Sequence, residues 1–202
     1  MSTPERTSEL VLASGNVGKI REFQQLLTPL GWTLRAQSDF DTPEAAETGL
    51  SFVENAIIKA RNAASYSGLP ALADDSGLEV DALKGAPGIY SARYAGPENS
   101  DQANNQKLLA ELAAVSPEQR TARFQCVLAF MRHDQDPTPL ICQASWEGYI
   151  VDLPKGNNGF GYDPLFYIPA LDCCSAQLAP EQKNKLSHRA KAMAILLKQL
   201  GG

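Results

Sequence analysis

Short apolar runs alternate along the chain with longer stretches in which apolar residues recur at helical spacing. Short runs bounded by Gly, Pro, Asn or Asp are typical of strands, and the longer stretches are typical of amphipathic helices. The predicted strands are Glu9 to Ala13, Trp32 to Ala36, Leu69 to Ala73, Phe124 to Phe130, Leu140 to Val151 and Leu165 to Ile168. The predicted helices begin near Asn16, Ser51, Ser100 and Ser187, and end near Leu27, Ser67, Val115 and Gly201. This mixture predicts an α/β fold with a hairpin extension.

Local signals mark the starts and stops of these helices. Asn16 is a good N-cap, and Ser51 with Glu54 matches a capping box. Gly201 is a typical stop after the last helix. The pattern contains no repeat and no low-complexity linker. We therefore expect one domain over residues 9–202, preceded by a loose tail over residues 1–8.

Composition narrows the classes of function. The chain has 202 residues, of which 44% are hydrophobic, so it can bury a sizeable core. Its net charge of -5 argues against a nucleic-acid partner, since such proteins usually carry a basic surface. No apolar run is long enough to span a membrane, and the first residues lack a signal-peptide core. The four cysteines form no CxxC pair, which favours free thiols in a reducing cytoplasm.

The segment SGNVGK, residues 14–19, follows the first predicted strand and opens the first predicted helix. A glycine-rich turn in this place, ending in Lys19, is typical of a phosphate-binding loop. The Walker A pattern, however, needs a longer spacing between its glycines and a Ser or Thr after the Lys. Here only two residues separate Gly15 from Gly18, and an Ile follows Lys19. The loop therefore predicts phosphate binding without a hydroxyl ligand for a metal ion.

Cations stand at the starts of two predicted helices, where the helix dipole disfavours them. Lys19 is in the first turn of its helix, and the first turn of the last helix contains His188, Arg189 and Lys191. An exposed cation there costs roughly 0.3–1 kcal/mol, whereas a bound polyanion makes the same charge favourable. We interpret these positions as a site for a phosphate-rich ligand, to which Lys59 adds a cation. The alternative is that they are solvated surface charges.

Carboxylates suitable for a metal ion follow the third predicted strand. Asp74 and Asp75 stand at its carboxyl end, where α/β sheets place ligands, and Glu47 precedes the second helix. Mg²⁺ prefers oxygen ligands, often one or two carboxylates together with water and substrate phosphates. Because side chains alternate across a strand, the two aspartates can point to different faces. The alternative for adjacent acids before Ser-Gly is an ordinary turn.

The segment GFGYDPLF, residues 159–166, places two aromatic residues beside glycines. Phe160 and Tyr162 are candidates for stacking on a nucleobase. The alternative is that both rings belong to the core at the end of a strand.

Together these motifs resemble one family, the inosine triphosphate pyrophosphatases, which hydrolyse non-standard purine nucleoside triphosphates. The matching segments are SGNVGK (14–19), AETGLSFVENAIIKA (46–60), ADDSGLEVDALKGAPGIYSARYAG (73–96), GFGYDPLF (159–166) and KNKLSHRAKA (183–192). They cover nearly the whole chain in order, and they are most similar to the bacterial dITP/XTP pyrophosphatases. The resemblance implies a homodimer and an elongated mixed sheet with flanking helices, with two lobes around a central substrate cleft.

The resemblance also implies a reaction in which a nucleoside triphosphate and water give the monophosphate and pyrophosphate, with Mg²⁺ as cofactor. It assigns Glu47 and Asp75 to the metal, Asp75 also to water activation, and Asp74 to the support of that site. The loop at residues 14–19 and Lys59 would surround the triphosphate, and the loop at residues 160–163 would hold the base. The substrate-binding positions are Ser14, Gly15, Asn16, Val17, Gly18, Lys19, Lys59, Ser76, Phe160, Gly161, Tyr162, Asp163, Lys183, His188 and Arg189.

Other interpretations remain open. A kinase or P-loop NTPase would need a Ser or Thr after Lys19. A non-catalytic nucleotide-binding module would keep the basic loop but would have no need of Asp75 and Glu47. A Maf-like pyrophosphatase shares the chemistry, but its signature motifs are not evident here. The chain also departs from the resembled family at residues 171–180, where LDCCSAQLAP replaces the usual GKTxAEL pattern.

Overall fold

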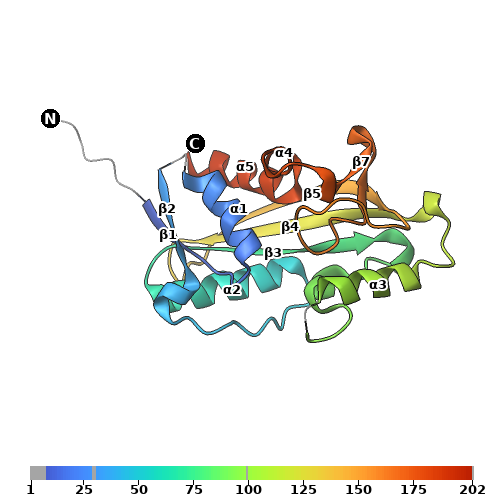
Figure 1. The fold of residues 1–202 in the computed structure, drawn as a ribbon. Helices are drawn as coiled ribbons and strands as arrows, with labels where there is room; N and C mark the ends of the chain where they lie inside the picture. Colours follow the sequence, from blue (N-terminus) through green and yellow to red (C-terminus); the bar gives the residue numbers. More distant parts are fainter. Residues whose placement is uncertain (1–7, 29–30, 99, 202) are drawn as a thin grey trace. The chain divides into compact units, whose positions relative to one another are not determined.

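The computed structural model describes residues 8–28, 31–98 and 100–201 (Figure 1). Residues 1–7 of the predicted tail lie outside this part of the chain. The chain divides into two compact units, which are described separately below. Unit 1 comprises the described residues of 1–75, 127–142 and 196–202, and unit 2 comprises those of 76–126 and 143–195. That the chain forms one domain stays a prediction.

The strands form one mixed sheet. They are β1 (Ser8–Leu12), β2 (Trp32–Ala36), β3 (Ala71–Val80), β4 (Thr121–Met131), β5 (Leu140–Ile150), β6 (Phe166–Ile168) and β7 (Cys173–Cys174). Their order in the sheet is β2-β1-β3-β4-β5-β6-β7. β1 pairs in parallel with β2 and β3, whereas β6 pairs antiparallel with β5 and β7. The predicted α/β fold with a mixed sheet is confirmed.

The α-helices of the described residues are α1 (Val17–Leu27), α2 (Phe52–Ser67), α3 (Asp101–Glu111), α4 (Pro180–Leu186) and α5 (His188–Leu200). The predicted caps at Asn16 and Ser51 are confirmed, because each side chain accepts a backbone N–H from the first turn that follows. Ser100, the predicted start of α3, caps that helix in the same way. These starts were predictable because a cap acts within a few residues of sequence. The prediction missed α4 and the two-residue strand β7, and it ended α3 too late.

One strand differs from its prediction in a way that matters for function. β3 was expected to end before Asp74, but it continues to Val80, so Asp74 and Asp75 lie inside the strand. The segment Asp-Asp-Ser-Gly has the composition of a turn. Here each aspartate finds a cation to pair with, and the apolar pattern resumes at Leu78. Tertiary partners thus override the local preference for a turn.

The core of unit 1 forms where α2 packs on the sheet. Four alanines of α2 are buried against the strands: Ala56, Ala60, Ala63 and Ala64. They pack in one cluster with Val11 of β1, Ala73 of β3 and Met131 of β4. Small side chains allow a helix to approach a sheet closely, and this brings Lys59, on the same helix, within reach of β3.

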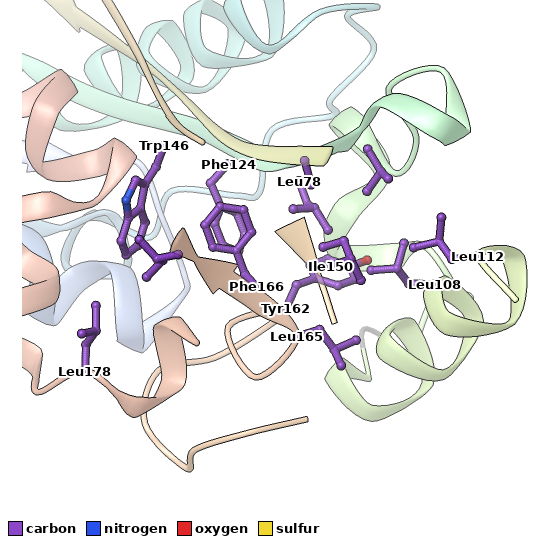
Figure 2. Close-up of a cluster of buried hydrophobic side chains, with 13 residues drawn as sticks. Leu78, Leu108, Leu112, Phe124, Trp146, Ile150, Tyr162, Leu165, Phe166 and Leu178 are labelled. Carbon is purple, nitrogen blue, oxygen red and sulfur yellow. The ribbon is translucent and has the colours of Figure 1, made fainter. Parts of the chain in front are cut away.

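The core of unit 2 is rich in aromatic rings (Figure 2). The ring of Phe124 lies 4.5 Å from that of Phe166, and Trp146 lies 5.6 Å from Phe166, measured between centroids. Leu108 and Leu112 anchor α3 in the same cluster. Buried aromatic rings contribute large apolar areas, so this cluster gives unit 2 a rigid base for the loops at its surface.

Candidate active site

The loop between β1 and α1 places polar groups at the start of a helix. Asn16 Oδ1 accepts the N–H of Lys19 at 3.0 Å, and the N–H of Asn16 donates to Ser14 Oγ at 3.2 Å. Residues 15–17 are exposed, and the first turn of α1 contains no acidic residue. The positive end of the helix dipole therefore faces solvent at this loop, which is a setting that binds anions.

The side chain of Lys19 contacts β3. Its Nζ lies 2.7 Å from Asp74 Oδ1, and the Asp74 side chain is fully buried. Neighbouring side chains on a strand point to opposite faces, so Asp75 points away from this contact. α1 and α2 lie on opposite sides of β3 in Figure 1, and each aspartate accordingly meets a lysine from a different helix. The expectation that the two aspartates face different ways is confirmed.

Lys59 of α2 joins two carboxylates. Its Nζ lies 2.6 Å from Asp75 Oδ1 and 3.1 Å from Glu47 Oε1. Burial by itself lowers the pKa of Lys59, but the nearby carboxylates, of which Asp75 is the strongest, outweigh this effect and raise it. Lys59 is therefore a fixed positive charge at neutral pH.

Asp75 has the properties of a proton acceptor. Burial raises the pKa of its carboxyl group, and the attraction of Lys59 offsets only part of that rise. A carboxylate with a raised pKa is a stronger base than an ordinary surface aspartate. Its Oδ2 atom is buried and has no hydrogen-bond partner among the described residues. One oxygen of Asp75 is thus available for a ligand, since buried polar atoms are normally paired.

The carboxylates of Glu47 and Asp75 suit a Mg²⁺ ion. Within residues 8–28, 31–98 and 100–201, no group of three or more His, Cys, Asp or Glu side chains could hold a metal ion. Mg²⁺ commonly takes one or two protein carboxylates and fills its other positions with water and substrate phosphates. The buried Oδ2 of Asp75, which no other described residue hydrogen-bonds, fits such a partly protein-bound ion.

The loop that carries Glu47 is fixed to the first turns of α2. The N–H of Gly49 donates to Asn55 Oδ1 at 2.9 Å, and the N–H of Leu50 donates to Glu54 Oε2 at 2.9 Å. A Cβ on Gly49 would lie 2.5 Å from the Cβ of Glu54, so a larger residue does not fit there. The sequence interpretation found Glu54 as a cap but missed Gly49 and Asn55. The available signal was a polar Asn among the apolar positions of a helix.

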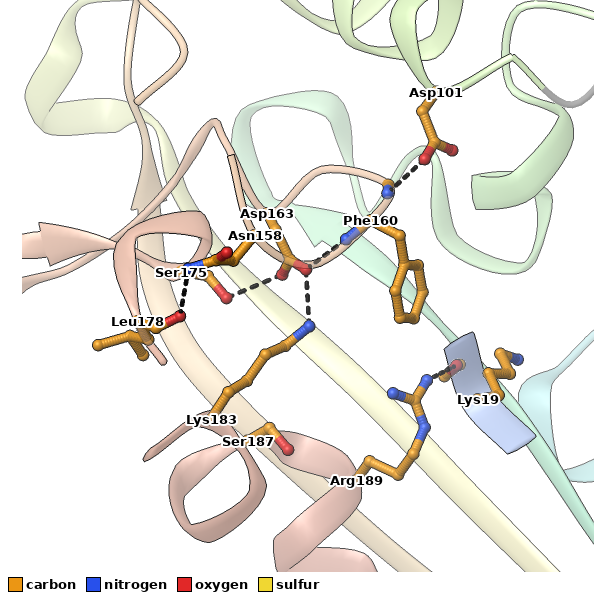
Figure 3. A network of polar contacts seen from close by, with 12 residues as sticks. Lys19, Asp101, Asn158, Phe160, Asp163, Ser175, Leu178, Lys183, Ser187 and Arg189 are labelled. Atoms are coloured by element: carbon orange, nitrogen blue, oxygen red, sulfur yellow. Dashed lines mark hydrogen bonds and ion pairs between the residues drawn. The ribbon is translucent and has the colours of Figure 1, made fainter. Parts of the chain in front are cut away.

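In unit 2, the buried carboxylate of Asp163 is the centre of a polar network (Figure 3). Lys183 Nζ lies 2.6 Å from Oδ2, and the N–H of Phe160 donates to the same oxygen at 2.9 Å. Ser175 Oγ donates to Oδ1 at 2.8 Å. The sequence interpretation included Asp163 and Lys183 but missed Ser175, which lies in the segment that departs from the resembled family's pattern.

The ring of Phe160 lies beside two cations. Lys183 Nζ is 4.9 Å from the ring centroid, and Arg189 Cζ is 5.8 Å from it. Arg189 is buried, and its Nη2 donates to Ser76 Oγ at 3.1 Å (Figure 3). Cation–π contacts and this hydrogen bond hold the aromatic ring and several N–H donors close together.

Two further predicted residues are placed by the aromatic core. The His188 ring stacks on Phe124 with centroids 4.9 Å apart and an angle of 17° between the planes. The Tyr162 ring is buried in the core of unit 2, and its hydroxyl donates to the carbonyl of Ser91 at 2.8 Å. Tyr162 therefore anchors the loop at residues 159–163 to the core. Of the two aromatic candidates, Phe160 is the one that remains for stacking on a nucleobase.

Gly159 provides a direct test of the Asp163 network. It has φ +78°, and a Cβ at this position would lie 2.0 Å from Asp163 Oδ2. We expect Gly159→Ala to lower the free energy of unfolding by more than the roughly 1–2 kcal/mol of left-handed strain, because the carboxylate must also leave Lys183. Chemical denaturation measures this loss.

Gly161→Ala is the matched control for this prediction. Gly161 also has a positive φ, +61°, but nothing lies within 4 Å of its would-be Cβ. It should show the strain alone, roughly 1–2 kcal/mol. Equal losses of stability in the two variants would contradict the assigned role of the Asp163 network.

The predicted site residues thus form one group in each unit. In unit 1, Lys19 pairs with Asp74 on one side of β3, and Lys59 pairs with Glu47 and Asp75 on the other. In unit 2, polar and cation–π contacts link Asp163, Lys183, Phe160, Arg189 and Ser76, and Gly161 follows Phe160 in the chain. Tyr162 and His188 instead pack against the aromatic core. Asp75 and Ser76 are consecutive residues of β3, so a peptide bond joins the two groups.

Comparison with known proteins shows the family. The sequence matches the Ham1 family over residues 10–199. The chain belongs to the Ham1 family. The dITP/XTP pyrophosphatase of Vibrio parahaemolyticus is 59% identical over 95% of this chain and 96% of its own length. The dITP/XTP pyrophosphatase of Thioalkalivibrio sulfidiphilus is 58% identical over 96% of this chain and 99% of its own.

Solved structures of Ham1 proteins have the same fold. A HAM1 protein from Coxiella burnetii gives a TM-score of 0.89 at 50% identity, covering 96% of this chain and 98% of its own. The Ham1 protein of Staphylococcus aureus gives a TM-score of 0.86 at 43% identity, covering 96% of this chain and 99% of its own. These relatives confirm the family that the sequence motifs predicted.

Within the part of this Ham1 chain that the structure describes, no helix has the length and apolar character of a membrane span.

Proposed function

We propose that this Ham1 protein hydrolyses non-standard purine nucleoside triphosphates, namely ITP, dITP and XTP, to the monophosphate and pyrophosphate, with Mg²⁺ as cofactor. One observation carries the proposal: Lys59 Nζ lies between Asp75 and Glu47, at 2.6 and 3.1 Å. A cation and two carboxylates at one place suit a triphosphate with its metal ion. The names of the relatives in Vibrio and Thioalkalivibrio support the same activity.

In this proposal, the residues of unit 1 bind the phosphates and the metal ion and activate the water molecule. The loop at 14–18 offers the N-terminus of α1 to the phosphates, and Lys19 and Lys59 add positive charge. Glu47 and Asp75 would hold Mg²⁺, which supplies Lewis-acid stabilisation of the phosphate oxygens when it is bound. Asp75 accepts a proton from the attacking water, for which its burial and raised pKa make it suitable. Asp74 holds Lys19 in place.

Attack at the α-phosphorus fits this distribution of charge. The bond that breaks joins the α-phosphorus to the bridging oxygen, so negative charge grows on the departing pyrophosphate. Fixed cations and a helix N-terminus stabilise such charge without having to reorganise during the reaction. Asp75 takes the proton that the water molecule loses. The oxygen of that water becomes part of the α-phosphate of the monophosphate.

In this proposal, the residues of unit 2 recognise the purine base of the substrate. Phe160 stacks on the purine, and Lys183 and Arg189 donate to the carbonyl at its 6-position. Hypoxanthine and xanthine have a carbonyl there, whereas adenine has an amino group that would face these donors without an acceptor. An unpaired buried polar group costs about 1–3 kcal/mol, so ATP is expected to be a poor substrate.

The other interpretations lose support. The chain belongs to the Ham1 family, and its loop lacks the hydroxyl that a P-loop enzyme needs. Asp75 combines a raised pKa with an oxygen that has no hydrogen-bond partner among the described residues, and this combination favours catalysis over binding alone. A homodimer and a cytoplasmic location stay predictions, and sedimentation of the purified protein would test the first of them.

A panel of substrates tests the proposed function. We expect Mg²⁺-loaded protein to convert ITP, dITP and XTP to the monophosphate, releasing pyrophosphate and no orthophosphate. ATP should react at least about tenfold more slowly, as the loss of one hydrogen-bonded carbonyl predicts. Separate assays for pyrophosphate and orthophosphate decide the outcome. Stepwise release of orthophosphate through a diphosphate, or equal rates for ATP and ITP, would contradict the proposal.

A further inference from the structure

A pair of polar side chains on α3 holds the loop that carries Phe160. The N–H of Gly161 donates to Asp101 Oδ2 at 2.7 Å, and the carbonyl of Gly161 accepts from Asn105 Nδ2 at 2.9 Å. Asp101 and Asn105 are one helical turn apart, so they lie on the same face of α3. Both backbone polar groups of a single loop residue are therefore bound by one helix.

The opposite end of the same short segment is held by Asp163. The N–H of Phe160 donates to Asp163 Oδ2 at 2.9 Å, and the N–H of the next residue, Gly161, donates to Asp101 (Figure 3). Two consecutive amide groups are thus bound by carboxylates from different parts of unit 2. This leaves the backbone around Phe160 little freedom, and the ring is held beside Lys183 and Arg189.

α3 itself is firmly anchored. Leu108 and Leu112 are fully buried in the aromatic core of unit 2. Asn104 is also buried, and its side chain accepts the N–H of Ala95 at 2.7 Å and donates to the carbonyl of Ala92 at 2.9 Å. A helix fixed in this way transmits its position to the loop that it holds.

We propose that Asp101 and Asn105 are positioning residues for nucleobase recognition, because they fix Gly161 and thereby preorganise Phe160 for a purine. This inference rests on the proposed function of the Phe160 side of the site. Because the ring is already ordered, the ligand binds without the entropic cost of ordering it, and its affinity is higher. The contacts act on the base and not on the reacting phosphorus, so their loss should weaken binding without slowing the chemical step.

Steady-state kinetics with ITP separate these effects. We expect Asp101→Ala and Asn105→Ala each to raise KM about tenfold and to change kcat by less than about twofold, as the loss of a hydrogen bond to the loop predicts. Inorganic tripolyphosphate, which has no base, should inhibit all variants with an unchanged Ki. Asp101→Asn keeps an acceptor oxygen and should restore most of the wild-type KM. Gln102→Ala, an exposed neighbour on α3, is the matched control.

Hydrogen exchange of the peptides that cover residues 156–163 tests, independently of activity, whether Asp101 and Asn105 hold the backbone of Gly161. Both alanine variants should exchange faster there than wild type, and Gln102→Ala should not. Unchanged exchange in both variants overturns the inference, as does a fall in kcat at constant KM, or a tripolyphosphate Ki that rises with KM. If Asp101→Ala melts far below wild type, the KM values and exchange rates of Asn105→Ala and Asp101→Asn test the inference instead.

The two proposals fail in distinguishable ways. If wild type does not hydrolyse ITP, the proposed function fails, while exchange and calorimetric binding of inosine monophosphate still decide whether Asp101 and Asn105 position the ring. If ITP is hydrolysed and the alanine variants match wild type in KM and exchange, only the positioning role fails.

Discussion

Asp75→Asn is expected to reduce kcat for ITP about 100- to 10,000-fold, because a general base contributes an effect of this size and an amide cannot accept the proton. The fold should survive. Burial already raises the pKa of Asp75, so a neutral side chain of the same shape suits that environment, and its amide oxygen can still accept from Lys59. Steady-state kinetics and thermal denaturation, run on the same preparations, measure both outcomes.

Glu79→Gln is the matched control for Asp75→Asn. Glu79 is a partly buried carboxylate on the same strand, and its Oε2 accepts from Gln125 Nε2 at 2.9 Å. Its replacement should leave kcat close to that of wild type. If Asp75→Asn retained full activity, Asp75 would not be the proton acceptor. If both variants lost activity equally, the effect would belong to β3 as a whole.

Lys19→Met is expected to lower both stability and activity, for separable reasons. The fully buried Asp74 loses the cation 2.7 Å away, and breaking a buried ion pair costs about 3–5 kcal/mol of unfolding free energy. The phosphates lose a charge-assisted hydrogen bond, which should reduce kcat/KM by roughly 10- to 100-fold. Denaturant titration measures the first loss, and ITP kinetics measure the second.

The double variant Lys19→Met/Asp74→Asn separates the two reasons. Removing both charges should recover most of the lost stability, because no uncompensated carboxylate remains buried. Activity should stay low, because the phosphate contact is still missing. Arg21→Met, an exposed cation on the same helix, controls for net charge. Recovery of kcat/KM in the double variant would show that Lys19 acts only through the fold.

Features that depend on nearby residues were predictable from the sequence. The caps at Asn16, Ser51 and Ser100 bind backbone groups three residues away, so their signals are complete within one short segment. The inverted charges at Lys19 and Arg189 were also visible, because helix starts and cations are both local. The strand and helix order followed from the spacing of apolar residues.

Features that depend on distant residues were not predictable in this way. β3 continues through Asp74 and Asp75, where lysines from two separate helices pair with them. Ser175 contacts Asp163, and Asp101 contacts Gly161 across 60 residues of sequence. Nothing in a short segment indicates such a partner, so these positioning residues became visible only in the folded chain.

Hydrolysis of ITP in ¹⁸O-labelled water tests the central claim most directly. Asp75 activates a water molecule that attacks the α-phosphorus in this account, so mass spectrometry should find the label in inosine monophosphate and none in pyrophosphate. Label in the pyrophosphate would show attack at the β-phosphorus. Label in orthophosphate would show attack at a terminal phosphate, and either result would contradict the assignment of the two lysines and Asp75 to this reaction.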